Sequence, residues 1–176
     1  GHSREQASLF AQFGFDGLFL GRVDYQDFDA RGASKTREML WQGSENLGDA
    51  ARIFTGILPN GYNPPPGFCW DQYCGDDPIM DDPNLDEYNV DQKVKDFLDY
   101  SHRQADQYKT SNLIMTMGSD FQYSNAHRWF KNLDKLIKYV NLEQTKSGSK
   151  VNIFYSTTAC YLYSLNMANT TWPMKY

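Results

Sequence analysis

The chain has 176 residues, a net charge of −5 and a hydrophobic content of 40%. This length corresponds to one domain or to part of a larger one, and the acidic balance argues against a nucleic-acid partner, because phosphate binding needs clustered lysine and arginine. No apolar run approaches the roughly 20 residues of a membrane span, so no membrane partner is expected.

The amino-terminal part of the chain predicts one helix and two strands. Apolar residues at helical spacing cover residues 3–13, and residues 17–21 form a short apolar run typical of a strand. The segment 30–47 is charged and poorly periodic, with a helix expected at 35–42. Residues 52–58 predict a second strand.

A long loop is predicted at 59–84, where six of the seven prolines lie. A loop of this length inside a compact domain is usually functional. It contains Cys69 and Cys74, which are candidates for a local disulfide in an oxidising compartment or for half of a zinc site, although no further ligands lie at zinc-finger spacing. Cys160 is left over, as a buried free thiol or the partner of a cysteine outside the chain. Asn169 begins a sequon for N-glycosylation, which agrees with the loop cysteines in favouring the secretory route.

The carboxyl-terminal part predicts alternating helices and strands. Helices are expected at 89–108, 125–140 and 157–168, and strands at 112–117 and 150–155. Such alternation predicts an α/β fold in which a parallel sheet carries helices on its faces. Right-handed crossovers would place the carboxyl ends of all its strands along one edge.

Four polar residues follow directly after the predicted strands: Arg22, Asp24, Asp120 and Ser156. Ligands bind at the carboxyl ends of strands in open α/β sheets and α/β barrels, so these side chains are candidates for one site. The alternative is the ordinary polarity of loops.

Asp120 is the most informative of these residues. It follows the apolar run 112–117 after Gly118 and stands among aromatic neighbours. A carboxyl walled by Phe121 and Tyr123 would have a raised pKa and could serve as a general acid. Spacing alone favours a different role, in which Ser119 or Asp120 caps the helix that follows.

The two ends of the sequence suggest an internal piece of a longer polypeptide. The first residues, 1–3, include no initiator methionine, and residues 172–176 show no evident stop. We therefore expect residues 1–176 to form a single partial domain.

Seven segments resemble the class II, lysosomal-type α-mannosidases of glycoside hydrolase family 38. They run through nearly the whole chain and are weakest at 28–48; they are residues 1–7, 15–17, 21–27, 58–64, 115–123, 129–134 and 155–157.

The resemblance implies part of an amino-terminal catalytic domain with a β/α barrel-like parallel sheet. It implies a retaining, zinc-dependent exo-α-mannosidase that removes terminal α-linked mannose from N-glycan oligosaccharides in the lysosome or the secretory pathway. The family's nucleophile, an aspartate that also binds zinc, would lie three residues before Gly1. The other zinc ligands also map outside residues 1–176, so the chain alone is expected to be inactive.

Three side chains match active-site positions of the family. Asp120 matches the general acid/base, Arg22 matches an active-site arginine that contacts substrate, and Tyr62 matches an active-site tyrosine. The resemblance also implies a disulfide between Cys69 and Cys74.

Two further features follow from the resemblance. Cys160 is expected to pair with a cysteine of the amino-terminal region, and Asn169 is expected to carry a glycan. Besides mannose-containing oligosaccharides, the expected partners are the remainder of the same polypeptide and, as an open alternative, a second copy of the chain.

Two other classes of protein stay open from the residues. A non-catalytic carbohydrate-binding module would have no need of an acid at Asp120. A metal-dependent polysaccharide deacetylase would need a His-x-x-x-His type of metal pair, which the sequence lacks.

Overall fold

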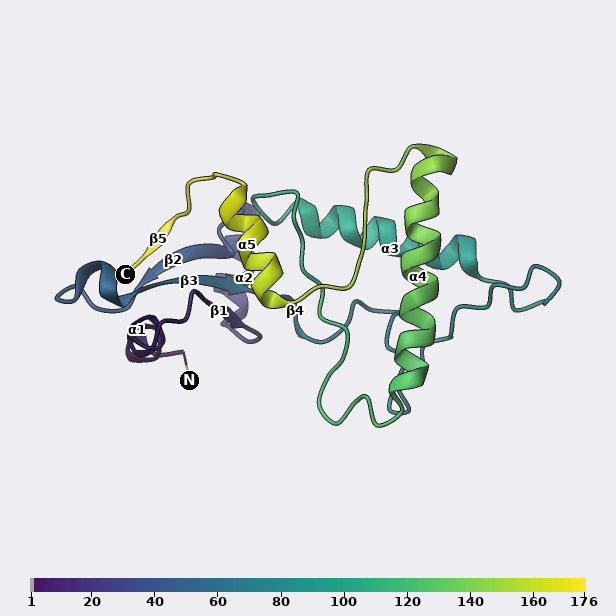
Figure 1. The fold of residues 1–176 in the computed structure, drawn as a ribbon, viewed down its shortest axis with the longest axis horizontal. Coiled ribbons are helices and arrows are strands. Elements are labelled where there is room, and N and C mark those ends of the chain that lie inside the picture. Colours follow the sequence, from purple (N-terminus) through teal and green to yellow (C-terminus); the bar gives the residue numbers. More distant parts are fainter. Residues whose placement is uncertain (1) are drawn as a thin grey trace. The chain divides into compact units, whose positions relative to one another are not determined.

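The computed structural model describes residues 2–176, and these divide into two compact units (Figure 1). The first unit contains the residues up to Gly61 together with 104–114 and 157–176. The second unit contains 62–103 and 115–156.

The first unit is built on a four-stranded mixed sheet. Its strand order is β1 (Gly17–Leu20), β3 (Arg52–Ile57), β2 (Glu38–Gln42) and β5 (Met174–Lys175). The pairs β1–β3 and β2–β5 are parallel, whereas β2–β3 is antiparallel. The expected α/β class is confirmed, and its mostly parallel sheet has one antiparallel pair at its centre.

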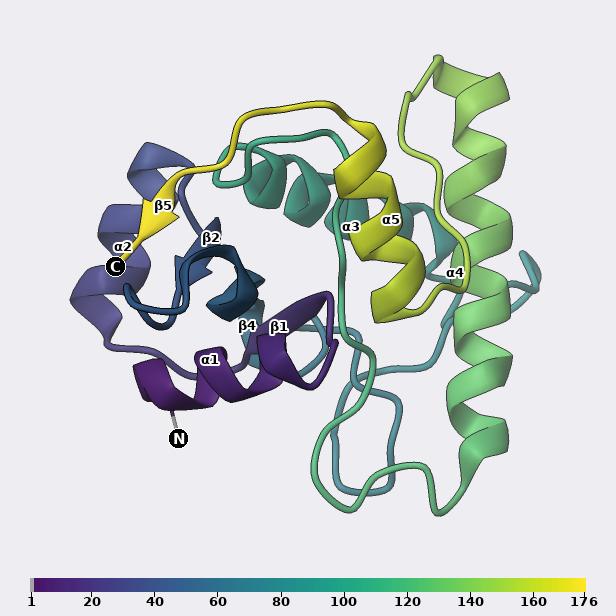
Figure 2. The same ribbon diagram turned by 60° about the vertical axis from the view of Figure 1, so that its left-hand side comes forward.

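One face of this sheet is covered by helix α1 (Arg4–Gln12), drawn in purple in Figure 2, which contacts β3 and β2. Ser3 caps the helix, as its side chain accepts a hydrogen bond from the Gln6 amide. Ala7 is fully buried against Trp41 and Ile53, which face each other across β2 and β3. The opposite face packs on helix α5 (Thr158–Met167) through a cluster of buried residues: Phe54, Tyr161 and Leu165.

The segment 25–42 differs from its prediction. Helix α2 (Tyr25–Ser34) begins after Asp24, whose carboxylate accepts hydrogen bonds from the amides of Gln26 and Asp27. Residues 35–42 hold strand β2 and not a helix. The prediction was wrong because two polar residues of this strand, Glu38 and Gln42, are buried, which hides its alternating pattern.

The strands predicted at 112–117 and 150–155 are also not formed, although both segments pack against buried residues of the second unit through Met115, Met117, Val151 and Ile153. For residues 150–155, a side chain of the preceding helix, Ala126–Ser147, supplies the backbone hydrogen bonds that a neighbouring strand would supply. The amide of Asn141 donates to the Ile153 carbonyl and accepts from its N–H. Apolar alternation here reflects packing on a helix and not pairing in a sheet.

The second unit consists of two helices and long connecting loops. Helix α4 (Ala126–Ser147) crosses α3 (Val90–Ala105), whose residues belong to this unit up to Arg103 (Figure 1). Between the helices lies a core of ten buried apolar side chains, which include the aromatic residues Phe68, Trp70, Phe97 and Trp129. Trp70 and Trp129 are fully buried.

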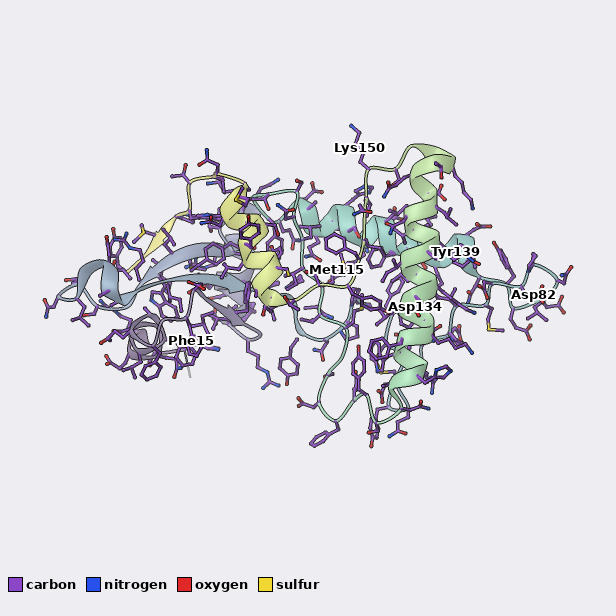
Figure 3. The ribbon with its side chains drawn as sticks, viewed as in Figure 1. Phe15, Asp82, Met115, Asp134, Tyr139 and Lys150 are labelled. Atoms are coloured by element: carbon purple, nitrogen blue, oxygen red, sulfur yellow. A yellow bond between two sulfur atoms is a disulfide. The ribbon has the colours of Figure 1, made fainter. Side chains whose placement is uncertain are left out.

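Side chains of α4 also hold the loops (Figure 3). Tyr139 donates a hydrogen bond to Asp81 at 2.9 Å, and Lys135 forms an ion pair with the same carboxylate at 2.6 Å. Asp134 accepts a hydrogen bond from Tyr155 at 2.8 Å. The loop predicted at 59–84 is confirmed apart from its first residues, which form β4 (Pro59–Tyr62). The first unit also contains a short 3-10 helix, Gly48–Ala51. Within residues 2–176, no helix has the length and apolar character needed to cross a membrane.

Candidate active site on the 118–123 turn

Asp120 lies in a turn of unusual backbone conformation, residues 118–123, in the second unit. Two of its non-glycine residues, Phe121 and Tyr123, have left-handed φ angles of 61° and 68°. Such residues cost about 1–3 kcal/mol each, and they persist only where the surrounding structure holds them. Backbone strain of this kind concentrates at functional sites.

The turn is held from inside by the side chain of Tyr123. Its ring stacks on Trp129 with the ring centres 5.0 Å apart, and its hydroxyl donates to the Met117 carbonyl. Gly118 has a φ of 151°, and a Cβ there would lie 2.9 Å from the Tyr123 ring. Only glycine therefore allows the ring to close the turn.

The beginning of the turn is tied to the end of β4. The Tyr62 hydroxyl donates a long hydrogen bond of 3.4 Å to Oδ2 of Asp120. Ser119 donates to the side chain of Asn63 at 2.7 Å, and Thr116 donates to the Asn63 carbonyl at 2.9 Å. Two of the three expected active-site side chains, Asp120 and Tyr62, are thus neighbours, although 58 residues separate them.

The competing role of Asp120 as a helix cap is wrong. Helix α4 begins at Ala126, and the residue at its N-cap position is Asn125. The expected aromatic wall is also wrong within residues 2–176, because the Phe121 side chain is 86% exposed and the Tyr123 ring packs on Trp129. Asp120 is itself exposed, so its carboxyl is accessible to a substrate.

A disulfide joins Cys69 and Cys74 next to this turn, as expected. The Gln122 side-chain amide donates to both sulfur atoms at 3.4 Å. This contact links the disulfide loop to the residues that follow Asp120.

Mass spectrometry of a non-reduced digest is expected to show Cys69 and Cys74 joined. The bridge closes a loop with a sequence separation of 5, so the loop-closure model gives it only about 2 kcal/mol of stabilisation. Its larger effect should be to shape the surface that Gln122 contacts. Recovery of both cysteines as free thiols from the native protein would contradict this expectation.

Asp71, within the disulfide loop, is a residue that the sequence analysis missed. Its exposed fraction is 2%. Oδ2 accepts hydrogen bonds from the Tyr123 amide at 2.9 Å and from the Trp129 indole at 2.7 Å, and Oδ1 accepts one from the Tyr73 amide at 3.4 Å. The available signal was a lone carboxylate between two nearby cysteines, flanked by aromatic residues.

The other polar residues predicted at strand ends are distributed over both units. Arg22 follows β1 in the first unit and is exposed, while Asp24 serves as the cap of α2. Ser156 lies in the second unit. Asp120 and Ser156 were included because strands were expected before them, and those strands are not formed. These two residues therefore do not lie at strand ends, and a single site containing all four residues remains a prediction.

A cavity of about 170 Å³ lies in the first unit, near the carboxyl ends of β1 and β3. Charged side chains of both signs line it, but Asp24 caps α2 and Asp27 forms an ion pair with Arg31 at 2.8 Å. Within residues 2–176, no group of three or more His, Cys, Asp or Glu side chains is arranged to hold a metal ion.

Two residues that were candidates for covalent modification, Cys160 for a disulfide and Asn169 for a glycan, lie in or next to α5. Cys160 is exposed, so the expectation of a buried thiol is wrong, and it forms no disulfide within residues 2–176. Asn169 follows the end of α5 and is also exposed, as a glycan acceptor must be.

An accessible carboxyl beside a phenol, on a strained turn of an α/β domain, is an arrangement that suits a glycoside hydrolase. The profile of the family described as "Glycosyl hydrolases family 38 N-terminal domain" matches residues 1–176. The chain therefore belongs to glycosyl hydrolase family 38.

Similar proteins within this group are α-mannosidases. The chain is 56% identical to lysosomal alpha-mannosidase of Cavia porcellus and 55% identical to that of Homo sapiens, over 99% and 100% of its own length. It is 43% identical over 99% of its length to the alpha-mannosidase of Canavalia ensiformis. In each case the chain spans 17% of the relative's length.

Proposed function

We propose that the polypeptide containing this chain is a retaining exo-α-mannosidase that removes terminal α-linked mannose from N-glycan oligosaccharides. The observation that carries the proposal is the exposed carboxyl of Asp120, next to the Tyr62 hydroxyl on a held turn, in a chain that matches family 38 throughout. Mannose-containing oligosaccharides are accordingly the proposed substrates.

In this mechanism Asp120 acts twice. Its protonated carboxyl gives a proton to the glycosidic oxygen while the bond from that oxygen to the anomeric carbon breaks and a second carboxylate attacks the carbon. Asp120, now ionised, then takes a proton from the water that releases mannose. Retaining enzymes keep the two carboxyl groups roughly 5–5.5 Å apart, and we propose that the nucleophile lies outside residues 1–176.

Two side chains are proposed to assist. Tyr62 orients the Asp120 carboxyl through its hydroxyl. Arg22, whose guanidinium is a planar fork of donors, is proposed to bind sugar hydroxyls or a carboxylate.

Zinc is the cofactor that the resemblance implies. Residues 2–176 do not fit such a site, because no group of three or more His, Cys, Asp or Glu side chains among them is arranged to hold a metal ion. No step is therefore derived through zinc, and its ligands are proposed to lie elsewhere in the polypeptide, whose remainder is then a necessary partner.

A lysosomal or secretory location is proposed on three observations. The relatives from Cavia porcellus and Homo sapiens are lysosomal enzymes by name. The bridge between Cys69 and Cys74 suits an oxidising compartment, and Asn169 is an exposed sequon. No described feature favours a carbohydrate-binding module or a deacetylase over a family 38 hydrolase.

The stereochemistry of the product tests the proposal. Proton NMR during hydrolysis of an α-linked mannose oligosaccharide by the complete polypeptide is expected to show α-mannose as the first product, before mutarotation. First formation of β-mannose would overturn the retaining mechanism, and failure to release mannose from any α-linked substrate would overturn the activity.

A further inference from the structure

Asp71 is a buried anchor that joins two segments far apart in the sequence. It lies in the loop closed by the disulfide, and its Oδ2 atom binds two donors that lie 52 and 58 residues away, the Tyr123 amide and the Trp129 indole. Both donors are themselves in contact, because the Tyr123 ring stacks on that of Trp129. One oxygen atom therefore holds the end of the 118–123 turn against the first helical turn of α4.

The anchor depends on an ionised carboxylate. Burial alone would raise the pKa of Asp71, but hydrogen bonds from the Tyr123 amide and the Trp129 indole outweigh this effect and hold the pKa below its usual value. The side chain accepts hydrogen bonds from the N–H groups of Tyr73, Tyr123 and Trp129. A carboxylate is acceptor-only and serves all of them, whereas an amide would direct a donor at one of them.

The position of Tyr123 explains what the anchor controls. Tyr123 has a left-handed φ of 68° and comes three residues after Asp120. On the other side of Asp120, Ser119 binds the side chain of Asn63. The acid/base candidate thus lies between two anchors, one at Asn63 and one at Asp71, and the second binds the backbone amide of the left-handed residue Tyr123.

We propose that Asp71 is a positioning residue for the Asp120 carboxyl, acting through the Tyr123 amide and the 118–123 turn. The inference rests on the proposed function, since it assumes that Asp120 transfers the proton. It adds a residue that touches neither substrate nor reacting atoms and that has no place in the sequence-based site.

Loss of the anchor should affect proton transfer selectively. Without Asp71, the Tyr123 amide and the Trp129 indole lose a buried acceptor, and the left-handed turn loses one of the contacts that hold it. A displacement of about 1 Å at a catalytic group can cost on the order of 10²-fold in rate. This cost should appear only where the leaving group needs a proton.

The test compares two substrates in the complete polypeptide. For Asp71→Ala, kcat/KM on an α-mannobiose, whose sugar leaving group needs protonation, is expected to fall on the order of 10²-fold. On dinitrophenyl α-mannoside, whose leaving group departs unprotonated, kcat/KM should stay close to that of the unsubstituted enzyme. Because kcat/KM reports the first bond-breaking step, the second step does not obscure the comparison.

Asp76→Ala is the matched control. Asp76 also binds an amide of the disulfide loop, that of Cys69 at 2.9 Å, but no described hydrogen bond joins Asp76 itself to the 118–123 turn. It should change both substrates equally or not at all. An equal loss on both substrates for Asp71→Ala would show a purely structural role and would overturn the inference.

Two further variants, Asp71→Asn and Asp120→Asn, complete the test. If Asp71→Ala does not fold, Asp71→Asn should show the same substrate selectivity with a smaller loss, and faster hydrogen exchange at the Tyr123 amide. Neither selectivity nor faster exchange in that variant would overturn the inference. Asp120→Asn separates the role of Asp71 from the acid/base role of Asp120. If Asp120→Asn shows the substrate selectivity and the Asp71 variants do not, the positioning role of Asp71 is refuted and the acid/base role stands. If Asp120→Asn shows no selectivity, both roles are refuted.

Discussion

Asp120→Asn in the complete polypeptide is expected to lower kcat/KM on a natural mannose oligosaccharide by about 10²–10⁴-fold, the usual contribution of general acid catalysis. Asparagine has nearly the same shape as aspartate and can still accept the 3.4 Å hydrogen bond from Tyr62. It cannot give or take the catalytic proton. The measurement is steady-state hydrolysis of the oligosaccharide, with dinitrophenyl α-mannoside as a substrate that should escape the defect in the first step.

Asp86→Asn provides the control for this result. Asp86 is an exposed carboxylate of the same unit, and the same chemical change there should leave both rates unaltered. Near-normal hydrolysis of the oligosaccharide by Asp120→Asn would contradict the acid/base role and would leave Asp120 as a polar residue of a strained turn.

The turn itself could not have been derived from local sequence patterns. The apolar run 112–117 predicted a strand with Asp120 shortly after its end, and its apolar side chains are indeed half-buried. What places Asp120, however, is contact with distant residues: Tyr62 and Asn63 on one side and Asp71 on the other. Periodicity carries no information about such contacts, and it was the family resemblance that matched both Tyr62 and Asp120 to active-site positions.

Sequence patterns predicted the features that depend on residues close together in the chain. The cap of α1 at Ser3 and the cap of α5 at Thr157 depend on a side chain and an amide within three residues, and both helices begin where they were predicted. Strand β2 was missed for the opposite reason. Oε1 of its polar residue Glu38 accepts a hydrogen bond from Tyr161, a partner 123 residues away.

Glu38 provides the clearest pH dependence in the structure. The side chain is 2% exposed, Tyr161 donates a hydrogen bond of 2.5 Å to Oε1, and Oε2 has no partner among the described residues. Burial raises the pKa of Glu38, the hydrogen bond from Tyr161 opposes this rise, and the net result is a pKa raised from 4.5 to about 7. The carboxyl therefore suits its site when it is protonated and costs free energy when it is ionised.

The sign of the effect follows from proton binding. Between pH 4.5 and about 7 the folded protein holds the Glu38 proton and the unfolded chain does not, so the free energy of unfolding falls as the pH rises through this range. The stabilisation is complete below pH 4.5 and lost near pH 7, and its full extent is about 3 kcal/mol, at roughly 1.4 kcal/mol for each pH unit.

Glu38→Gln, which is neutral at every pH, should remove this dependence. Thermal unfolding of the complete polypeptide from pH 4.5 to 7.5 is expected to show the variant gaining stability over the unsubstituted protein as the pH rises, whereas the exposed Glu45→Gln should follow the unsubstituted protein throughout. A difference between Glu38→Gln and the unsubstituted protein that stays constant over this range would contradict a buried, protonated carboxyl. A fold whose central strand is most stable with Glu38 protonated is suited to the acidic lumen that a lysosomal location implies.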